Sequence, residues 1–256
     1  MKSYLATARM CVRNKNEFGL LWTLGEYLLK LISLLAQAMV WRAVLPEGAV
    51  VDGMTQQSML VYITVSSALA PLLDVRTPAS SWLHDGTILG LFQRPCPIYG
   101  QLVAHTVGSW AIPLVGYGIP LLLISTLLGY PPVPASPWFW LSLVLCICQG
   151  FAVDFAFACL LIRMNNLEWT MHSLRNALTA LLTGGLIPFA ALPWGLGRWL
   201  ELSPLGTLAG APLALMSGLG DPERLIGAQL FWNLALWPFA CWAFRASRER
   251  MVSYGG

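Results

Sequence analysis

The chain has 256 residues, a formal net charge of +3, 57% apolar residues, only 11% charged residues and twelve tryptophans. A soluble globule of this length needs more polar surface than this composition provides. The composition therefore excludes a soluble globular protein and predicts an integral membrane protein.

Six stretches are apolar and long enough to cross a membrane as helices, since spanning a hydrocarbon core of about 30 Å takes about 20 residues. We expect transmembrane helices at residues 19–44, 55–75, 98–128, 137–163, 170–190 and 225–244. The expected fold class is an all-α integral membrane protein with six transmembrane helices, in which residues 1–256 form a single transmembrane domain.

Residues 1–18 precede the first span and predict an amphipathic helix at the membrane interface. One helical face gathers Tyr4, Leu5, Ala8 and Val12, and the basic residues are Lys2, Arg9, Arg13 and Lys15. These bases can meet lipid phosphates. An ordinary basic flank of a membrane span would explain the charges equally well.

Glu26 and Lys30 lie four residues apart in the first span, a spacing and order that favour an ion pair on one helix face. Further ionisable residues inside spans are Asp154 and Arg175. At about 1.5 Å per residue all four fall within one half of the bilayer, so we expect a polar network. It can be a set of ion pairs that holds helices together, the polar wall of a substrate path, or a proton-coupling site.

A short amphipathic segment lies between the second and third spans, and we expect one helix at residues 78–92. Its apolar side chains are too many to face water comfortably, and they are Trp82, Ile88, Leu89, Leu91 and Phe92. Part of the helix can rest on the membrane and part can enter the groove of a partner. Asp85 near its start can meet a cation, and Arg94 at its end suits the helix dipole. An interfacial helix without a partner is the alternative.

The third span carries small residues every four positions, at Gly100, Ala104 and Gly108. Such spacing lets helix backbones approach closely in membranes. It predicts a contact with a second membrane subunit.

The stretch from Gly184 to Gly220 is apolar but interrupted by Pro188, Pro193, Pro204 and Pro212, and each half is too short to cross the membrane. We expect a re-entrant helical hairpin at residues 191–216, between the fifth and sixth spans. Trp194 and Trp199 would lie in the aromatic belt of the interface.

Basic residues gather on one side when the six spans are threaded in order. They are Lys2, Arg9, Arg13, Lys15, Arg76, Arg94, Arg163, Arg245, Arg248 and Arg250. The opposite loops hold Glu47, Asp52, Arg198, Glu201, Asp221, Glu223 and Arg224. The positive-inside rule therefore predicts that both termini and the 78–92 helix are cytoplasmic.

The sequence contains no recognisable catalytic set, such as G-x-S-x-G or H-E-x-x-H. A phosphate-binding loop is excluded because none of the three lysines, Lys2, Lys15 and Lys30, follows a glycine. The scattered cysteines do not predict a metal site. We expect a non-catalytic chain without a metal or cofactor of its own, so that any ATP used would be bound by another polypeptide.

Four short motifs occur in a particular order along the chain. They are Trp41-Arg42, Gly86 with Arg94-Pro95, Gly184-Gly185-Leu186-Ile187-Pro188 and Tyr254-Gly255-Gly256. Together with the order of spans, they make the chain resemble the permease subunits of ATP-binding-cassette exporters of the type-2 superfamily, in particular the six-span subgroup of about this length. The family often has leucines directly before Arg-Pro, whereas this chain has Leu91-Phe92-Gln93.

The resemblance implies an ATP-driven exporter subunit in the inner or plasma membrane of a prokaryote, embedded in the lipid bilayer. ATP and Mg²⁺ would bind to separate nucleotide-binding ATPase subunits, and a second permease, identical or different, would complete the pathway. No nucleic-acid partner is expected. The 78–92 helix would be a coupling helix that contacts the ATPase through Trp82, Asp85, Gly86, Ile88, Leu89, Phe92, Arg94 and Pro95.

A re-entrant gate would include Gly184, Gly185, Pro188, Pro193 and Trp194. The family resemblance brings in drugs, antibiotics, lipids, peptides and glycans as cargo, and an apolar pathway favours hydrophobic or amphiphilic molecules. Two other functions stay open. One is a proton-coupled secondary transporter that titrates Asp154 or Glu26, and the other is a membrane assembly factor without transport activity.

Overall fold

The structure is a computed structural model that describes residues 4, 6–11, 20–45, 50–51, 53–84, 87–94, 96–163, 168–185, 187–189, 192 and 195–254. The regular elements among these residues are helices, apart from one short antiparallel pair of strands, β1 (Val50–Val51) and β2 (Met54–Thr55). The helices are α2 (Leu20–Val44), α3 (Gln56–Ala68), α4 (Ala70–Leu73), α5 (Ala79–His84), α6 (Leu89–Phe92), α7 (Ile98–Pro113), the π-helix η1 (Leu114–Gly118), α8 (Ile119–Leu127), α9 (Trp138–Arg163), α10 (Glu168–Leu182), α11 (Leu196–Glu201), α12 (Gly206–Ser217) and α13 (Pro222–Tyr254). The predicted all-helical fold is confirmed for this part of the chain.

Three of these helical stretches are long and apolar enough to cross a membrane, namely Trp22–Val44, Ile98–Leu127 and Trp138–Leu161. They match the first, third and fourth expected spans and support a multi-pass membrane protein. The other three expected spans coincide with shorter or more mixed helices. In the fifth, α10 ends at Leu182 after 15 residues, and the expected sixth span lies within α13, which has 33 residues.

The expected second span is divided into α3 and α4 at Leu69. Pro71 lies in the first turn of α4. It has no N–H to donate, and its ring clashes with the carbonyl four residues earlier, which kinks or breaks a helix. The α3 helix therefore has 13 residues, which is shorter than a membrane crossing.

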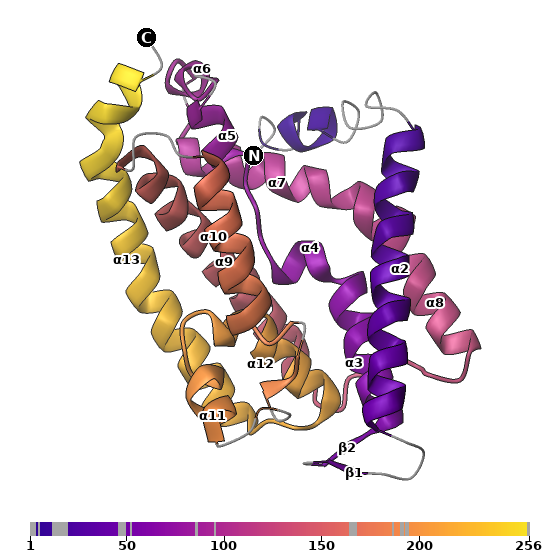
Figure 1. Cartoon of the computed structure of the whole chain (residues 1–256). Coiled ribbons are helices and arrows are strands. Elements are labelled where there is room, and N and C mark those ends of the chain that lie inside the picture. The colour runs from indigo at the N-terminus through magenta and orange to yellow at the C-terminus, as the bar shows by residue number, and fades with distance from the viewer. Residues whose placement is uncertain are drawn as a thin grey trace.

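The stretch Ile98–Leu127 bends where α7 passes through η1 into α8, as Figure 1 shows. Pro113 removes one backbone hydrogen bond at this point, and prolines and π-turns are common causes of helix bends. Gly118 lies against α3 so closely that an added Cβ would be 2.6 Å from the carbonyl oxygen of Ala68. Only a glycine permits this contact between η1 and α3.

The long helix α9 packs against α12 and along α13, while α2, α3 and α8 pack together in the other half of the molecule. Figure 1 shows α5, α6 and the end of α13 at one end of the molecule. The β1–β2 pair and α11 lie at the opposite end. These two ends are separated by the lengths of α2 and α9.

The glycine face of α7 is covered by the chain's own N-terminal segment. An added Cβ at Gly108 would lie 2.5 Å from the carbonyl oxygen of Ala8, and one at Gly100 would lie 3.0 Å from the ring of Tyr4. Residues 6–11 are helical. The expectation that this face contacts a second subunit is therefore wrong at both glycines, because the sequence pattern cannot tell which helix fills a small-residue groove.

Candidate functional site

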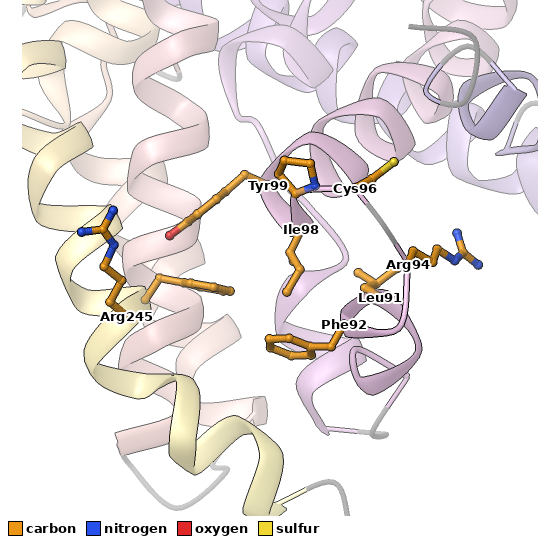
Figure 2. A pocket seen from close by; sticks show the side chains of 9 residues that line it. Leu91, Phe92, Arg94, Cys96, Ile98, Tyr99 and Arg245 are labelled. Carbon is orange, nitrogen blue, oxygen red and sulfur yellow. The ribbon is translucent and has the colours of Figure 1, made fainter.

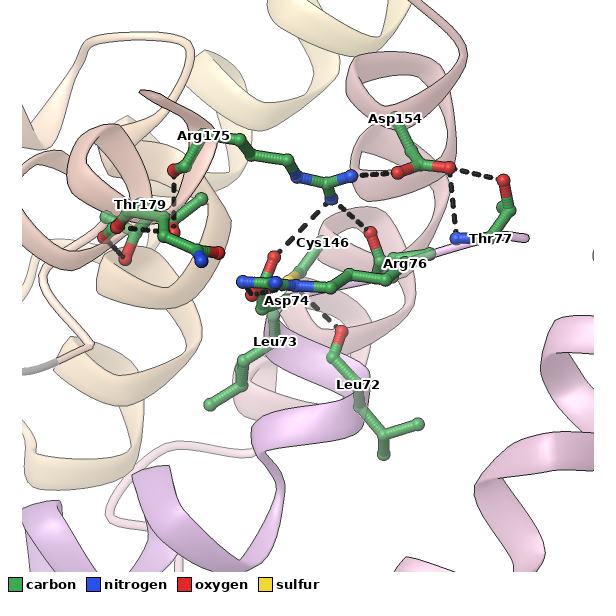
Figure 3. A network of polar contacts seen from close by, with 12 residues as sticks. Leu72, Leu73, Asp74, Arg76, Thr77, Cys146, Asp154, Arg175 and Thr179 are labelled. Atoms are coloured by element: carbon green, nitrogen blue, oxygen red, sulfur yellow. Dashed lines mark hydrogen bonds and ion pairs between the residues drawn. The ribbon is translucent and has the colours of Figure 1, made fainter. Parts of the chain in front are cut away.

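A buried cluster of charges joins α9, α10 and the connection between α4 and α5. Asp154 on α9 is 1% exposed and Arg175 on α10 is 7% exposed. One guanidinium nitrogen of Arg175 donates to Asp154 Oδ1. The other, Nη2, donates to the carbonyl oxygen of Val75 at 2.6 Å and to Asp74 Oδ1 at 3.5 Å, as Figure 3 shows.

The second carboxylate oxygen of Asp154 contacts Thr77, two residues after Val75. It accepts the backbone N–H of Thr77 at 3.0 Å and also the hydroxyl of Thr77. Asp74 accepts the guanidinium of Arg76 at 2.5 Å. Buried charges persist only when paired and hydrogen-bonded, and both oxygens of Asp154 are satisfied in this way. The cluster therefore fixes residues 74–77 onto two long helices.

Residues 74–77 lead directly into the 78–96 segment, whose other end is also fixed. Gln101 on α7 is 4% exposed. Its side-chain amide donates to the carbonyl oxygens of Leu91 at 3.2 Å and Cys96 at 2.9 Å. The 78–96 segment is thus attached to α9 and α10 at its start and to α7 at its end.

Two short helices, α5 and α6, replace the single helix expected at residues 78–92. Ile88 is 1% exposed and Leu91 is 6% exposed, so they face the interior and not a partner, contrary to the expectation. They pack in one core with Leu102 and Phe155. The described residues that form the outer surface are Ser81, Thr87, Gly90, Gln93 and Arg94.

The remaining residues expected to contact an ATPase vary in how they are placed. The Trp82 ring packs edge-on against His105 at a centroid distance of 4.7 Å, and Phe92 is half-buried. Asp85, Gly86 and Pro95 lie outside the described residues, and so does the side chain of Leu89. The exposed side chains that the structure describes in this segment, Ser81, Thr87, Gln93 and Arg94, are polar.

A hollow of about 320 Å³ separates the end of the 78–96 segment from α13. Figure 2 shows Phe92 and Ile98 on the wall of this hollow, between Arg94 on one side and Arg245 on the other. Its lining is mainly apolar.

Glu26 and Lys30 do not join the cluster. The expected ion pair between them is not formed; the Lys30 ammonium lies 5.9 Å from the ring centroid of Tyr27 and 6.0 Å from that of Tyr117. Both residues line a hollow of about 200 Å³ whose far wall includes Asp74 and Arg76. Attraction to two electron-rich ring faces competes with a solvent-exposed ion pair. Of the four residues of the predicted network, the structure brings together only Asp154 and Arg175.

Two residues of the expected gate, Gly184 and Gly185, are held against α3. The carbonyl oxygen of Gly184 accepts the hydroxyl of Tyr62, and that of Gly185 accepts the hydroxyl of Ser66 at 2.6 Å. Gly184 has φ +72°, a conformation that favours glycine. Pro188 is buried, while Pro193 and Trp194 lie outside the described residues.

Within the region of the predicted hairpin, residues 191–216, the described residues form two short consecutive helices, α11 and α12, joined at residues 202–205. The α12 helix is buried along most of its length. Trp199 on α11 is 82% exposed. Burial raises the pKa of the neighbouring Glu201, and Arg224 partly opposes that shift.

Comparisons with protein-family models, with curated proteins and with solved structures found no match for the chain.

Proposed function

We propose that the chain is the membrane subunit of an ATP-driven exporter, in which the 78–96 segment receives the motion of a separate ATPase. In this proposal the chain crosses the membrane six times and both termini are cytoplasmic. A second permease subunit, identical or different, completes the pathway. The cargo is hydrophobic or amphiphilic.

The observation that carries the proposal is the double attachment of the 78–96 segment. Its start is held by Asp154 and Arg175, and its end by Gln101. A surface loop without a mechanical role does not need buried ion pairs, because their burial costs desolvation energy. A force applied to α5 and α6 would pass through these bonds to α7, α9 and α10. Two of these, α7 and α9, belong to candidate membrane spans.

A proton-coupled transporter is less well supported. Both oxygens of Asp154 are engaged, one by the guanidinium of Arg175 and the other by Thr77, as in an ion pair that holds helices together. Glu26 would be the remaining candidate carrier. Such a transporter would work in vesicles under a pH gradient without any ATPase, which separates the two functions experimentally.

The proposal is tested by adding bulk to the outer surface of α6. Gly90 is exposed, and a Cβ added there would meet no described atom within 4 Å. The side chain of Gly90→Trp therefore starts in open space, and we expect it to block a partner with little effect on the chain's own packing. We expect the ATPase activity that co-purifies with the co-expressed chain to fall about tenfold or more, as for a central interface position.

Gly227→Trp is the matched control. Gly227 is also exposed, helical and without neighbours within 4 Å of an added Cβ, but it lies near the start of α13 at the opposite end of the molecule. It should retain the ATPase. If no ATPase co-purifies with the unmodified chain, or if Gly90→Trp and Gly227→Trp behave alike, the exporter proposal fails.

A further inference from the structure

A stripe of polar residues runs along one face of α2. Its members recur every three or four positions, as residues on one face of a helix do, and they are Thr23, Glu26, Lys30, Ser33 and Gln37. All five lie in the candidate membrane span Trp22–Val44. At about 1.5 Å per residue the stripe is about 21 Å long, most of the way across a hydrocarbon core of about 30 Å.

Two hollows follow this stripe and meet at Lys30. The first, of about 200 Å³, is lined by Glu26, Lys30, Asp74 and Arg76 among others. The second, of about 210 Å³, is lined by Lys30, Ser33, Gln37 and the hydroxyl residues Ser66 and Ser67. We call these two adjoining hollows the polar groove.

A third hollow, of about 280 Å³, extends the groove toward α10. It shares Asp74 and Arg76 with the first hollow and Ser66 with the second, and it adds Asn176 and Thr179 from α10. Hydroxyl, amide and charged groups from α2, α3 and α10 therefore line three adjoining hollows. The neighbouring exposed side chains on α2 are apolar: Leu29 is 68% exposed and Val40 is 58% exposed.

Glu26 and Lys30 carry opposite charges and are both exposed in the groove. Among the described residues neither forms a salt bridge. Inside a membrane span, a carboxylate without a salt bridge and an ammonium that lies only over the rings of Tyr27 and Tyr117 are costly, and such charges usually mark a functional path. A ligand with a single charge would satisfy one of them and repel the other. A ligand with both charges would satisfy the two together.

We propose that the polar groove binds the zwitterionic headgroup of an amphiphile, with the ligand's cation at Glu26 and its anion at Lys30. The two residues are separated by about one helical turn of 5.4 Å, comparable with the separation of the charges in a phosphocholine headgroup. The apolar tail lies outside the groove, against the exposed face that includes Leu29 and Val40. The inference rests on the proposed function in one respect, since it names the class of cargo.

The test uses the full chain with its six cysteines replaced by alanine, in phosphatidylglycerol vesicles that contain no zwitterionic lipid. A single cysteine is placed in the groove by Ser33→Cys, and the matched control is Leu35→Cys on the opposite face of α2, where Leu35 is 52% exposed. We expect a water-soluble maleimide to modify the groove position and not the control. Diheptanoyl phosphatidylcholine should slow the modification, whereas diheptanoyl phosphatidylglycerol should not.

Glu26→Gln and Lys30→Gln should each raise the protecting concentration of the phosphatidylcholine on the order of tenfold, the effect of losing one charge-assisted contact. Glu26→Asp should retain protection. The inference is overturned if Ser33→Cys is as unreactive as Leu35→Cys, if Ser33→Cys cross-links two copies of the chain, or if both lipids protect equally. No ATPase is present in this assay, so its result is independent of the co-purification experiment.

Discussion

Asp154 and Arg175 are the two residues whose replacement, one at a time, should reduce the stability of the fold most. Asp154→Ala leaves a buried guanidinium without its carboxylate, and removing one partner of a buried ion pair costs about 3–5 kcal/mol. Asp154→Leu combined with Arg175→Met removes both charges, and replacing a buried pair by apolar residues is often nearly neutral. We therefore expect the double variant to regain most of the thermal stability of the detergent-purified protein.

Arg94→Met is the control for that comparison, because Arg94 is exposed and its replacement should leave the melting temperature nearly unchanged. A double variant as unstable as Asp154→Ala would contradict the prediction. That outcome would mean that the bond from Arg175 to the carbonyl oxygen of Val75 stabilises the fold more than the ion pair does.

Two residues of this cluster can be identified from the sequence alone, and the reason is physical. A charge within an apolar stretch stands out because burying it is costly, which singled out Asp154 and Arg175. Their other partners, Asp74 and Thr77, lie where Pro71 interrupts the helix, and their role depends on how the chain turns there. Glu26 and Lys30 had suitable spacing for a pair, but spacing along one helix does not reveal the ring of Tyr117 on a neighbouring helix.

At the level of elements, the apolar residues of the 78–96 segment illustrate a similar limit. Composition correctly indicates that Ile88 and Leu91 must avoid water. It does not say whether a partner or the chain itself covers them, and here they pack with Leu102 and Phe155 of the same chain. The start and length of α2 and α9 were predictable because long apolar runs depend on local composition alone.

The position of the N-terminal residues 6–11 should depend on Gly108 of α7. Gly108→Val places side-chain atoms where the backbone of Ala8 lies 2.5 Å from an added Cβ, so residues 6–11 must move away. We expect trypsin to cleave after Arg9 several-fold faster in this variant, because protease cleavage follows local opening. Gly25→Val is the control, since an added Cβ at Gly25 meets nothing within 4 Å. Equal cleavage rates in the two variants would show that the segment does not depend on this contact.

For the whole molecule, the position of α10 decides how the chain crosses the membrane. With 15 residues it is about 22 Å long at 1.5 Å per residue, shorter than the roughly 30 Å core. Figure 1 shows it beside α9, running from the end that holds α5 toward the end that holds α11. Most of its described side chains are exposed, and Arg175 is the buried one. The ion pair with Asp154 therefore holds a helix that has little other packing.

We can test whether α10 and the residues after it cross the membrane by finding on which side of the membrane two exposed positions lie. Gly90 on α6 and Arg198 on α11 are separated along the chain by the spans Ile98–Leu127 and Trp138–Leu161 and by α10. If α10 crosses, the number of intervening crossings is odd and the two positions lie on opposite sides of the membrane. If it does not, the number is even and they lie on the same side.

We expect opposite sides, because α5 and α6 lie at one end of the molecule and α11 at the other. In a chain without its natural cysteines, Gly90→Cys should react with an impermeant maleimide only from the cytoplasmic face of sealed vesicles, and Arg198→Cys only from the outer face. If both cysteines react from one face, only two helices cross the membrane between them. Arg175 would then lie on a helix that enters the membrane and returns, and its pairing with Asp154 would fix the depth of that entry.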